Sequence, residues 1–68
     1  MALQEVKVTT DTDTKGFSLA VEQLDGGGYI AVEPGFNGIQ PGQLTKTYVD
    51  GVVHWAQRRR NRLAFLPD

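Results

Sequence analysis

The chain is short and nearly neutral: 68 residues, seven of them Lys or Arg and eight Asp or Glu, with a formal net charge of −1. This length holds one small domain, residues 1–68. A domain of this size buries only about 60% of the surface that its unfolded chain exposes, and disulfides, metals or oligomerisation commonly stabilise it. The absence of cysteine excludes disulfides and thiolate metal sites, and one histidine leaves little for other metals. Homo-oligomerisation therefore stays open.

The first half of the chain predicts three strands joined by turns, at residues 4–10, 17–24 and 29–33. Val6 and Val8 alternate with polar neighbours, which is the period of a half-buried strand. Residues 25–28, Asp-Gly-Gly-Gly, favour the tip of a hairpin between the second and third strands. The two prolines and three glycines of residues 34–42 indicate a loop.

Residues 44–57 fit two structures, an amphipathic helix or a β-hairpin. Gly51 disfavours the helix by about 1 kcal/mol relative to alanine, and the many β-branched residues favour strands. Asp50 and Gly51 lie between apolar pairs, the pattern of a type I′ turn with positive φ at both positions. We therefore predict a hairpin, with the helix as the alternative. Its cross-strand pairs would be Val49 with Val52, Tyr48 with Val53 and Thr47 with His54.

The end of the chain repeats the pattern. Residues 58–61 are polar and end in a turn-favouring Asn, and residues 63–66 form a short apolar run before Pro67. Six candidate strands with regular turn signals predict an all-β domain, a small antiparallel barrel of five to six strands, SH3-like or OB-like. The alternative is an α+β domain with a three-stranded sheet and a C-terminal helix. We interpret Tyr48 and Trp55 as core residues of the barrel. The alternative is that they are exposed beside the arginines, where they would form a stacking platform for bases.

One segment matches a calcium-binding loop in part. Asp11, Asp13, Gly16 and Glu22 occupy four positions of the EF-hand pattern. Lys15, however, stands where an oxygen ligand belongs and would place a positive charge beside the cation. A solvated loop is the preferred interpretation, and we predict no metal site.

No catalytic or cofactor-binding site is predicted, and we do not expect an enzyme. A general base such as His54 needs a nucleophile within hydrogen-bond reach, but the chain has no cysteine and a single serine, Ser18. A surface pair of His54 with Thr47 is the simpler interpretation. The glycine run at residues 26–28 has the composition of an anion-binding turn, but a flexible hairpin tip is the preferred interpretation.

Positive charge is concentrated near the C-terminus. All four arginines, Arg58, Arg59, Arg60 and Arg62, lie within five positions. Residues 1–57 hold three lysines against seven acidic residues, a charge of −4, whereas residues 58–68 carry +3. Arginine forms bidentate contacts with carboxylates and phosphates, so these four residues are the predicted partner-binding site. The alternative is a solvated turn whose arginines pair with carboxylates of the same or a neighbouring subunit.

These features predict a non-enzymatic binding module that contacts an acidic protein surface or nucleic acid. A self-assembling homo-oligomeric structural subunit, such as a virion or ring component, is the alternative. The N-terminal residues lack the basic and apolar regions of a signal peptide, and no apolar run reaches the ~18 residues of a membrane span. We therefore expect a cytoplasmic or virion location and no membrane partner.

Overall fold

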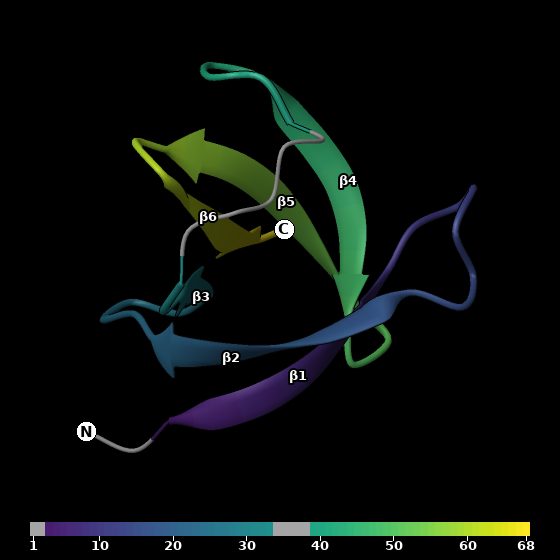
Figure 1. Cartoon of the computed structure of the whole chain (residues 1–68), viewed down its shortest axis with the longest axis horizontal. Coiled ribbons are helices and arrows are strands. Elements are labelled where there is room, and N and C mark those ends of the chain that lie inside the picture. Colours follow the sequence, from purple (N-terminus) through teal and green to yellow (C-terminus); the bar gives the residue numbers. More distant parts are fainter. Residues whose placement is uncertain (1–2, 34–38) are drawn as a thin grey trace.

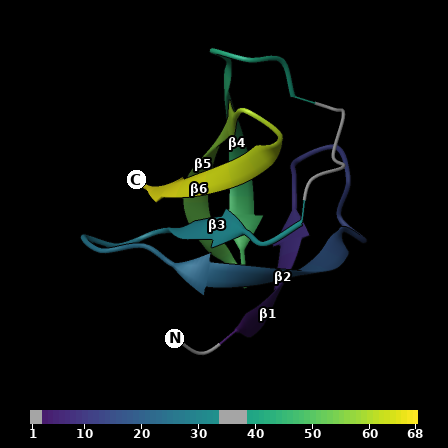
Figure 2. The ribbon, with the colours of Figure 1, turned by 60° about the vertical axis from the view of Figure 1, so that its left-hand side comes forward.

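Six antiparallel strands close into a barrel in the computed structural model, which describes residues 3–33 and 39–68 (Figures 1 and 2). The strands are β1 (Gln4–Thr9), β2 (Phe17–Gln23), β3 (Tyr29–Ala31), β4 (Leu44–Val49), β5 (Val52–Arg59) and β6 (Arg62–Pro67). Around the barrel they follow the order β1-β2-β3-β6-β5-β4, and β4 pairs with β1 to close the ring. The small all-β barrel is confirmed. No helix lies in the described ranges, so the α+β alternative is wrong.

The hairpin of β4 and β5 follows the predicted turn. Asp50 and Gly51 have φ values of 50° and 84°, the positive values that a type I′ turn requires at both central positions. The predicted pairing of Thr47 with His54 and of Tyr48 with Val53 is observed. The helix alternative for residues 44–57 is therefore wrong, because the turn and the β-branched strands act together against it.

Two strand ends differ from the sequence prediction by two residues, and the other differences are of one residue. The turn between β5 and β6 holds only Arg60 and Asn61, so Arg58 and Arg59 belong to the ladder of β5. Strand β3 ends at Ala31, two residues earlier than expected. Residues 34–38 of the predicted loop lie outside the described residues.

The core is formed by the inward-facing positions of the alternating strands, as the pattern of Val6 and Val8 predicts. Phe65 is the largest fully buried side chain. Phe17, Leu19 and Tyr29 are partly buried and pack against this cluster. Its buried members are Val6, Val8, Val21, Ala31, Ile39, Val49, Ala56, Leu63 and Phe65.

The interpretation of Tyr48 and Trp55 as core residues is wrong. Both side chains are half-buried on the outer face of the barrel. The Tyr48 hydroxyl donates a 2.9 Å hydrogen bond to Asp11 Oδ1, and Trp55 Nε1 donates one of the same length to Asp68 Oδ1. Residue size suggests burial, but the turn at Asp50 fixes only which residues share a face, and the closure of the barrel decides which face points inward.

His54 is buried in the interior, not paired on the surface. It does lie opposite Thr47, but the side chain is only 7% exposed. Its Nδ1 lies 2.9 Å from the carbonyl oxygen of Val52, and its ring centroid is 5.5 Å from that of Tyr29. Because His54 and Thr47 point inward together, the cross-strand pair faces the core, and the Thr47 hydroxyl donates a 2.8 Å hydrogen bond to the His54 carbonyl.

Candidate functional site

The four arginines gather on one β-hairpin, residues 58–62, which we call the arginine hairpin. It joins β5 to β6 and lies at the opposite end of β5 from the β4–β5 turn (Figure 1). Arg59 pairs with Arg62 across the ladder, so these two side chains share the outer face. Arg58 pairs with Leu63, a core residue, and therefore belongs to the inner face. Arg60 forms the turn with Asn61.

The guanidinium groups are not neutralised by the described part of the chain. Arg59, Arg60 and Arg62 are exposed and Arg58 is half-buried. Arg58 Nε donates to the Arg60 carbonyl and Arg59 Nε donates to Gln57 Oε1, each at 3.2 Å. No carboxylate within residues 3–33 and 39–68 lies within 4.0 Å of an arginine nitrogen. The arginine hairpin is thus a concentrated, unpaired positive charge.

Arg60 holds a backbone conformation that favours glycine. Its φ of 56° lies in the left-handed region, where a residue with a Cβ is strained by about 1–2 kcal/mol. Glycine would satisfy this turn without strain. Arg60 is the first central residue of a two-residue hairpin turn, so the turn itself requires the positive φ, as it does at Asp50.

A surface depression of about 470 Å³ accompanies the hairpin. It is lined by Ile30 and the residues Arg59, Arg60, Asn61 and Arg62. Ile30 is the outward-facing partner of Ala64 on β6, so an apolar surface lies directly beside the charged tip. An anionic group bound here would meet several guanidinium donors at once.

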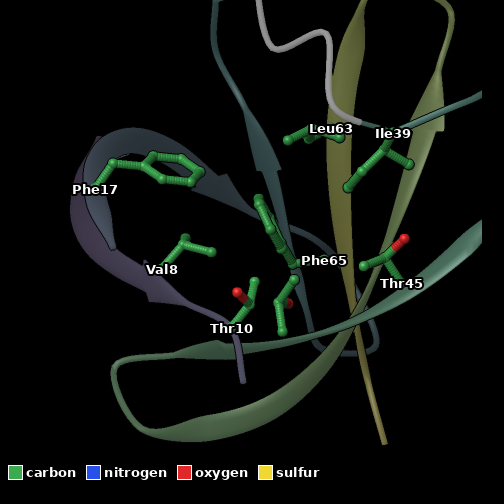
Figure 3. A pocket seen from close by; sticks show the side chains of 8 residues that line it. Val8, Thr10, Phe17, Ile39, Thr45, Leu63 and Phe65 are labelled. Atoms are coloured by element: carbon green, nitrogen blue, oxygen red, sulfur yellow. The ribbon is translucent and has the colours of Figure 1, made fainter. Parts of the chain in front are cut away.

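An apolar pocket of about 160 Å³ opens into the barrel interior (Figure 3). Its floor consists of buried residues, and its rim carries the half-buried side chains of Thr10, Phe17 and Thr45. The view in Figure 3 shows Phe65 between Val8 and Phe17 on one side and Leu63 and Ile39 on the other. The buried members are Val8, Ile39, Thr47, Leu63 and Phe65.

The pocket and the arginine hairpin share one end of the barrel. Leu63 lines the pocket and lies directly opposite Arg58, with both side chains on the inner face. Directly opposed residues of antiparallel strands have Cβ atoms about 4.5–5.5 Å apart. Pro41, two residues after the pocket residue Ile39, bridges to Arg58. Arg58 therefore neighbours a residue that lines the pocket without lining the pocket itself.

The structure places the residues of the calcium-like segment in other interactions. Asp11 accepts the hydrogen bond of Tyr48, and Asp13 Oδ1 accepts one from the backbone N–H of Gly16 at 3.0 Å. Glu22 lies within β2, opposite Ile30. Among the described residues, no three His, Cys, Asp or Glu side chains come together as metal ligands would.

The remaining chemical candidates are separated by the barrel wall. Ser18 pairs with Lys7 and is exposed on the outer face, whereas His54 is buried inside, so the two cannot form a nucleophile–base pair. In the glycine turn, the N–H of Gly27 donates to the carbonyl of Leu24 at 3.2 Å and is therefore not available to an anion. The glycine run is the tip of the β2–β3 hairpin, as predicted.

The sequence predicts the arginine site, but it does not predict the apolar pocket. A usable signal exists in the threonines of β4: once the register is known, Thr45 and Thr47 both face inward. Side chains this small at successive inner positions leave space that Val8, Leu63 and Phe65 do not fill. The prediction of Tyr48 as a core residue places Thr45 and Thr47 on the outer face of the barrel, where they could not line a pocket.

No family model, curated protein or solved structure matches the chain. Within the described residues, no helix has the length and apolar character to cross a membrane.

Proposed function

We propose that the chain is a non-enzymatic binding module whose arginine hairpin contacts an anionic macromolecule. One observation carries the proposal: four arginines lie on a single β-hairpin, three of them exposed, and they have no carboxylate partner in the described residues. Charge-assisted, bidentate contacts with carboxylates or phosphates are the strongest that arginine makes. A partner that supplies these oxygens can form such contacts without first breaking an ion pair of the described residues.

An acidic protein surface suits the charge distribution better than a nucleic acid does. The basic footprint is confined to the hairpin, whereas residues 1–57 carry −4. The sequence pI of about 5.7 lies far from the basic values typical of nucleic-acid-binding domains. A long polyanion would meet the repulsive remainder of the surface, while a compact acidic patch would not.

Replacing all four arginines of the hairpin by Gln tests the proposal. The substitutions keep polarity and approximate length, and each substitution at the three exposed sites should change stability by no more than about 0.5 kcal/mol. We expect binding of an oligoglutamate probe, measured by titration calorimetry at low salt, to fall at least about tenfold. A short DNA duplex serves as the second probe. If DNA is the ligand, its affinity should fall with salt at a log–log slope no steeper than roughly −3 to −4.

The matched control is the double variant Lys7→Gln, Lys15→Gln, because both lysines are exposed and lie outside the hairpin. This variant should bind the probes with the affinity of the wild type. We expect the affinity to depend on whether the removed charges lie on the arginine hairpin and not on the total charge. Equal binding of both probes by the wild type and the quadruple variant would contradict the proposal. A wild type that binds neither probe would also contradict the proposal.

A self-assembling structural subunit is the second candidate, favoured by the segregation of charge along β5. The arginine hairpin lies at one end of this eight-residue strand and Asp50 at the other, roughly 25 Å away at 3.3 Å per residue. Such polarity suits a head-to-tail contact between copies. Sedimentation of the wild type should then show an oligomer that the quadruple variant and raised salt both dissociate. A 7.5 kDa monomer at every concentration excludes this candidate.

A further inference from the structure

We propose that the apolar pocket receives an aromatic side chain from the same acidic protein segment that the arginine hairpin holds. This inference rests on the proposed function and deepens it, because it defines the partner as an acidic peptide that carries a phenyl group next to its carboxylates. The pocket and the hairpin are adjacent, yet they offer opposite chemistry to a ligand.

The size and lining of the pocket suit a phenyl ring. An apolar cavity of about 150 Å³ is sufficient for a benzene molecule, and this pocket measures about 160 Å³. Its floor is built from aliphatic and aromatic side chains, among them Val8, Leu63 and Phe65, which are almost completely buried. A ring seated on this floor would leave water and contact apolar atoms on several sides.

The polar atoms of the pocket do not suit a nucleobase. Three hydroxyl groups line it, and two are already engaged. The Thr47 hydroxyl donates to the His54 carbonyl at 2.8 Å, and Thr10 Oγ1 accepts the backbone N–H of Asp13 at 2.9 Å. Only Thr45 and the unused capacity of the Thr10 and Thr47 hydroxyls remain for the several donors and acceptors on the edge of a base. A buried base would therefore leave polar groups unpaired, whereas a phenyl ring has none.

Arg58 links the two halves of the site. It lies opposite Leu63 on the inner face, so its side chain starts about 5 Å from a pocket residue. Its Nε is held by the Arg60 carbonyl at 3.2 Å, which orients the guanidinium toward the hairpin tip. In an extended peptide, neighbouring residues are about 3.3 Å apart, so a carboxylate one or two positions from the ring reaches this region.

Two blocked peptides test the inference on the whole chain: acetyl-Asp-Glu-Phe-Glu-Asp-amide and a twin with Ala in place of Phe. Their charges are identical, so a difference in affinity reports the ring alone. We expect the Phe peptide to bind at least about tenfold more tightly, in line with the burial of one aromatic side chain. In NMR titrations, the ring should shift the methyl resonances of Leu63, Ile39 and Val8 and show contacts to them.

A variant that fills the pocket separates the two parts of the site. Thr45→Phe places an aromatic ring at the rim, and Leu44→Phe is the matched control because Leu44 is the exposed, outward-facing neighbour on the same strand. Thr45→Phe should bind both peptides with the affinity that the wild type has for the Ala peptide. Leu44→Phe should keep the preference for Phe. If Thr45→Phe does not fold, the methyl contacts in the wild type decide the question.

Each outcome affects one proposal or both. Equal affinity for the two peptides, or contacts of the ring outside the pocket, would overturn the pocket inference and leave the arginine hairpin as a charge-only site. Binding of DNA but of neither peptide would also overturn it, while the anionic binding module stands. Failure of the wild type to bind either peptide or DNA would remove the proposed function together with this inference.

Discussion

Gly28 and Gly51 form a matched pair that tests the geometry of the barrel. Both have positive φ, 88° and 84°, but their surroundings differ. A Cβ on Gly28 would lie 2.5 Å from the carbonyl oxygen of Phe65 and 3.1 Å from Pro67 Cδ, both on β6. A Cβ on Gly51 would meet no atom within 4 Å. Substitution by alanine therefore adds the same backbone strain at both sites but a collision at only one.

The expected magnitudes follow from these two contributions. An alanine at positive φ costs about 1–2 kcal/mol, and this is all that Gly51→Ala should lose. Gly28→Ala must also displace the backbone of a core strand, and such overpacking typically adds about 1–3 kcal/mol. In a domain of this size each kcal/mol lowers the Tm by about 4–8 °C. We expect a fall of about 4–16 °C for Gly51→Ala and clearly more for Gly28→Ala.

Thermal and urea unfolding, followed by circular dichroism and the fluorescence of Trp55, measure both variants. Equal decreases in Tm would refute the close approach of Gly28 to β6. A rise in Tm for Gly51→Ala would refute the type I′ turn, because alanine stabilises by about 0.5–1 kcal/mol only where the backbone is helical or extended. Gly51→Val, with its branched Cβ, should lose more stability than Gly51→Ala.

The other predictions concern single surface features. Arg60→Gly should raise the Tm by a few degrees, because it relieves the positive φ at the hairpin tip, and an unchanged or lower Tm would contradict the strain. A side-chain hydrogen bond to Tyr48 raises the pKa of Lys46, so Tyr48→Phe should lower that pKa in an NMR titration. The raised pKa stabilises the folded state. This stabilisation is present below the pKa of lysine in the unfolded chain and is lost as the pH rises through the raised pKa of Lys46 in the folded protein. Millimolar Ca²⁺ should change neither the Tm nor the tryptophan fluorescence, because Lys15 occupies a ligand position, and a saturable shift that Asp11→Ala abolishes would overturn this.

Local sequence patterns were sufficient to predict where the strands lie and to predict the pairing of one complete hairpin, β4–β5. Apolar alternation places Val6 and Val8 on one face without reference to the rest of the chain. The register of β4 and β5 follows from Asp50 and Gly51 alone, because a two-residue type I′ turn leaves a single way to pair the flanking residues. The arginine cluster is likewise visible in the linear order, and its place on an exposed hairpin follows from the polar run that interrupts two apolar segments.

Which face of a strand becomes the core is a property of the closed barrel. On β5, Trp55 is larger than His54 and Ala56, yet the two smaller side chains point inward, because the ring of six strands leaves little space inside. The sequence alone therefore determined where the strands and turns lie and that the positive charge is concentrated in residues 58–62. Only the tertiary structure decided that Arg58 lies opposite Leu63, a residue that lines an apolar pocket. The residues of that pocket come from strands and loops far apart in the chain, and only the closure of the barrel brings them together.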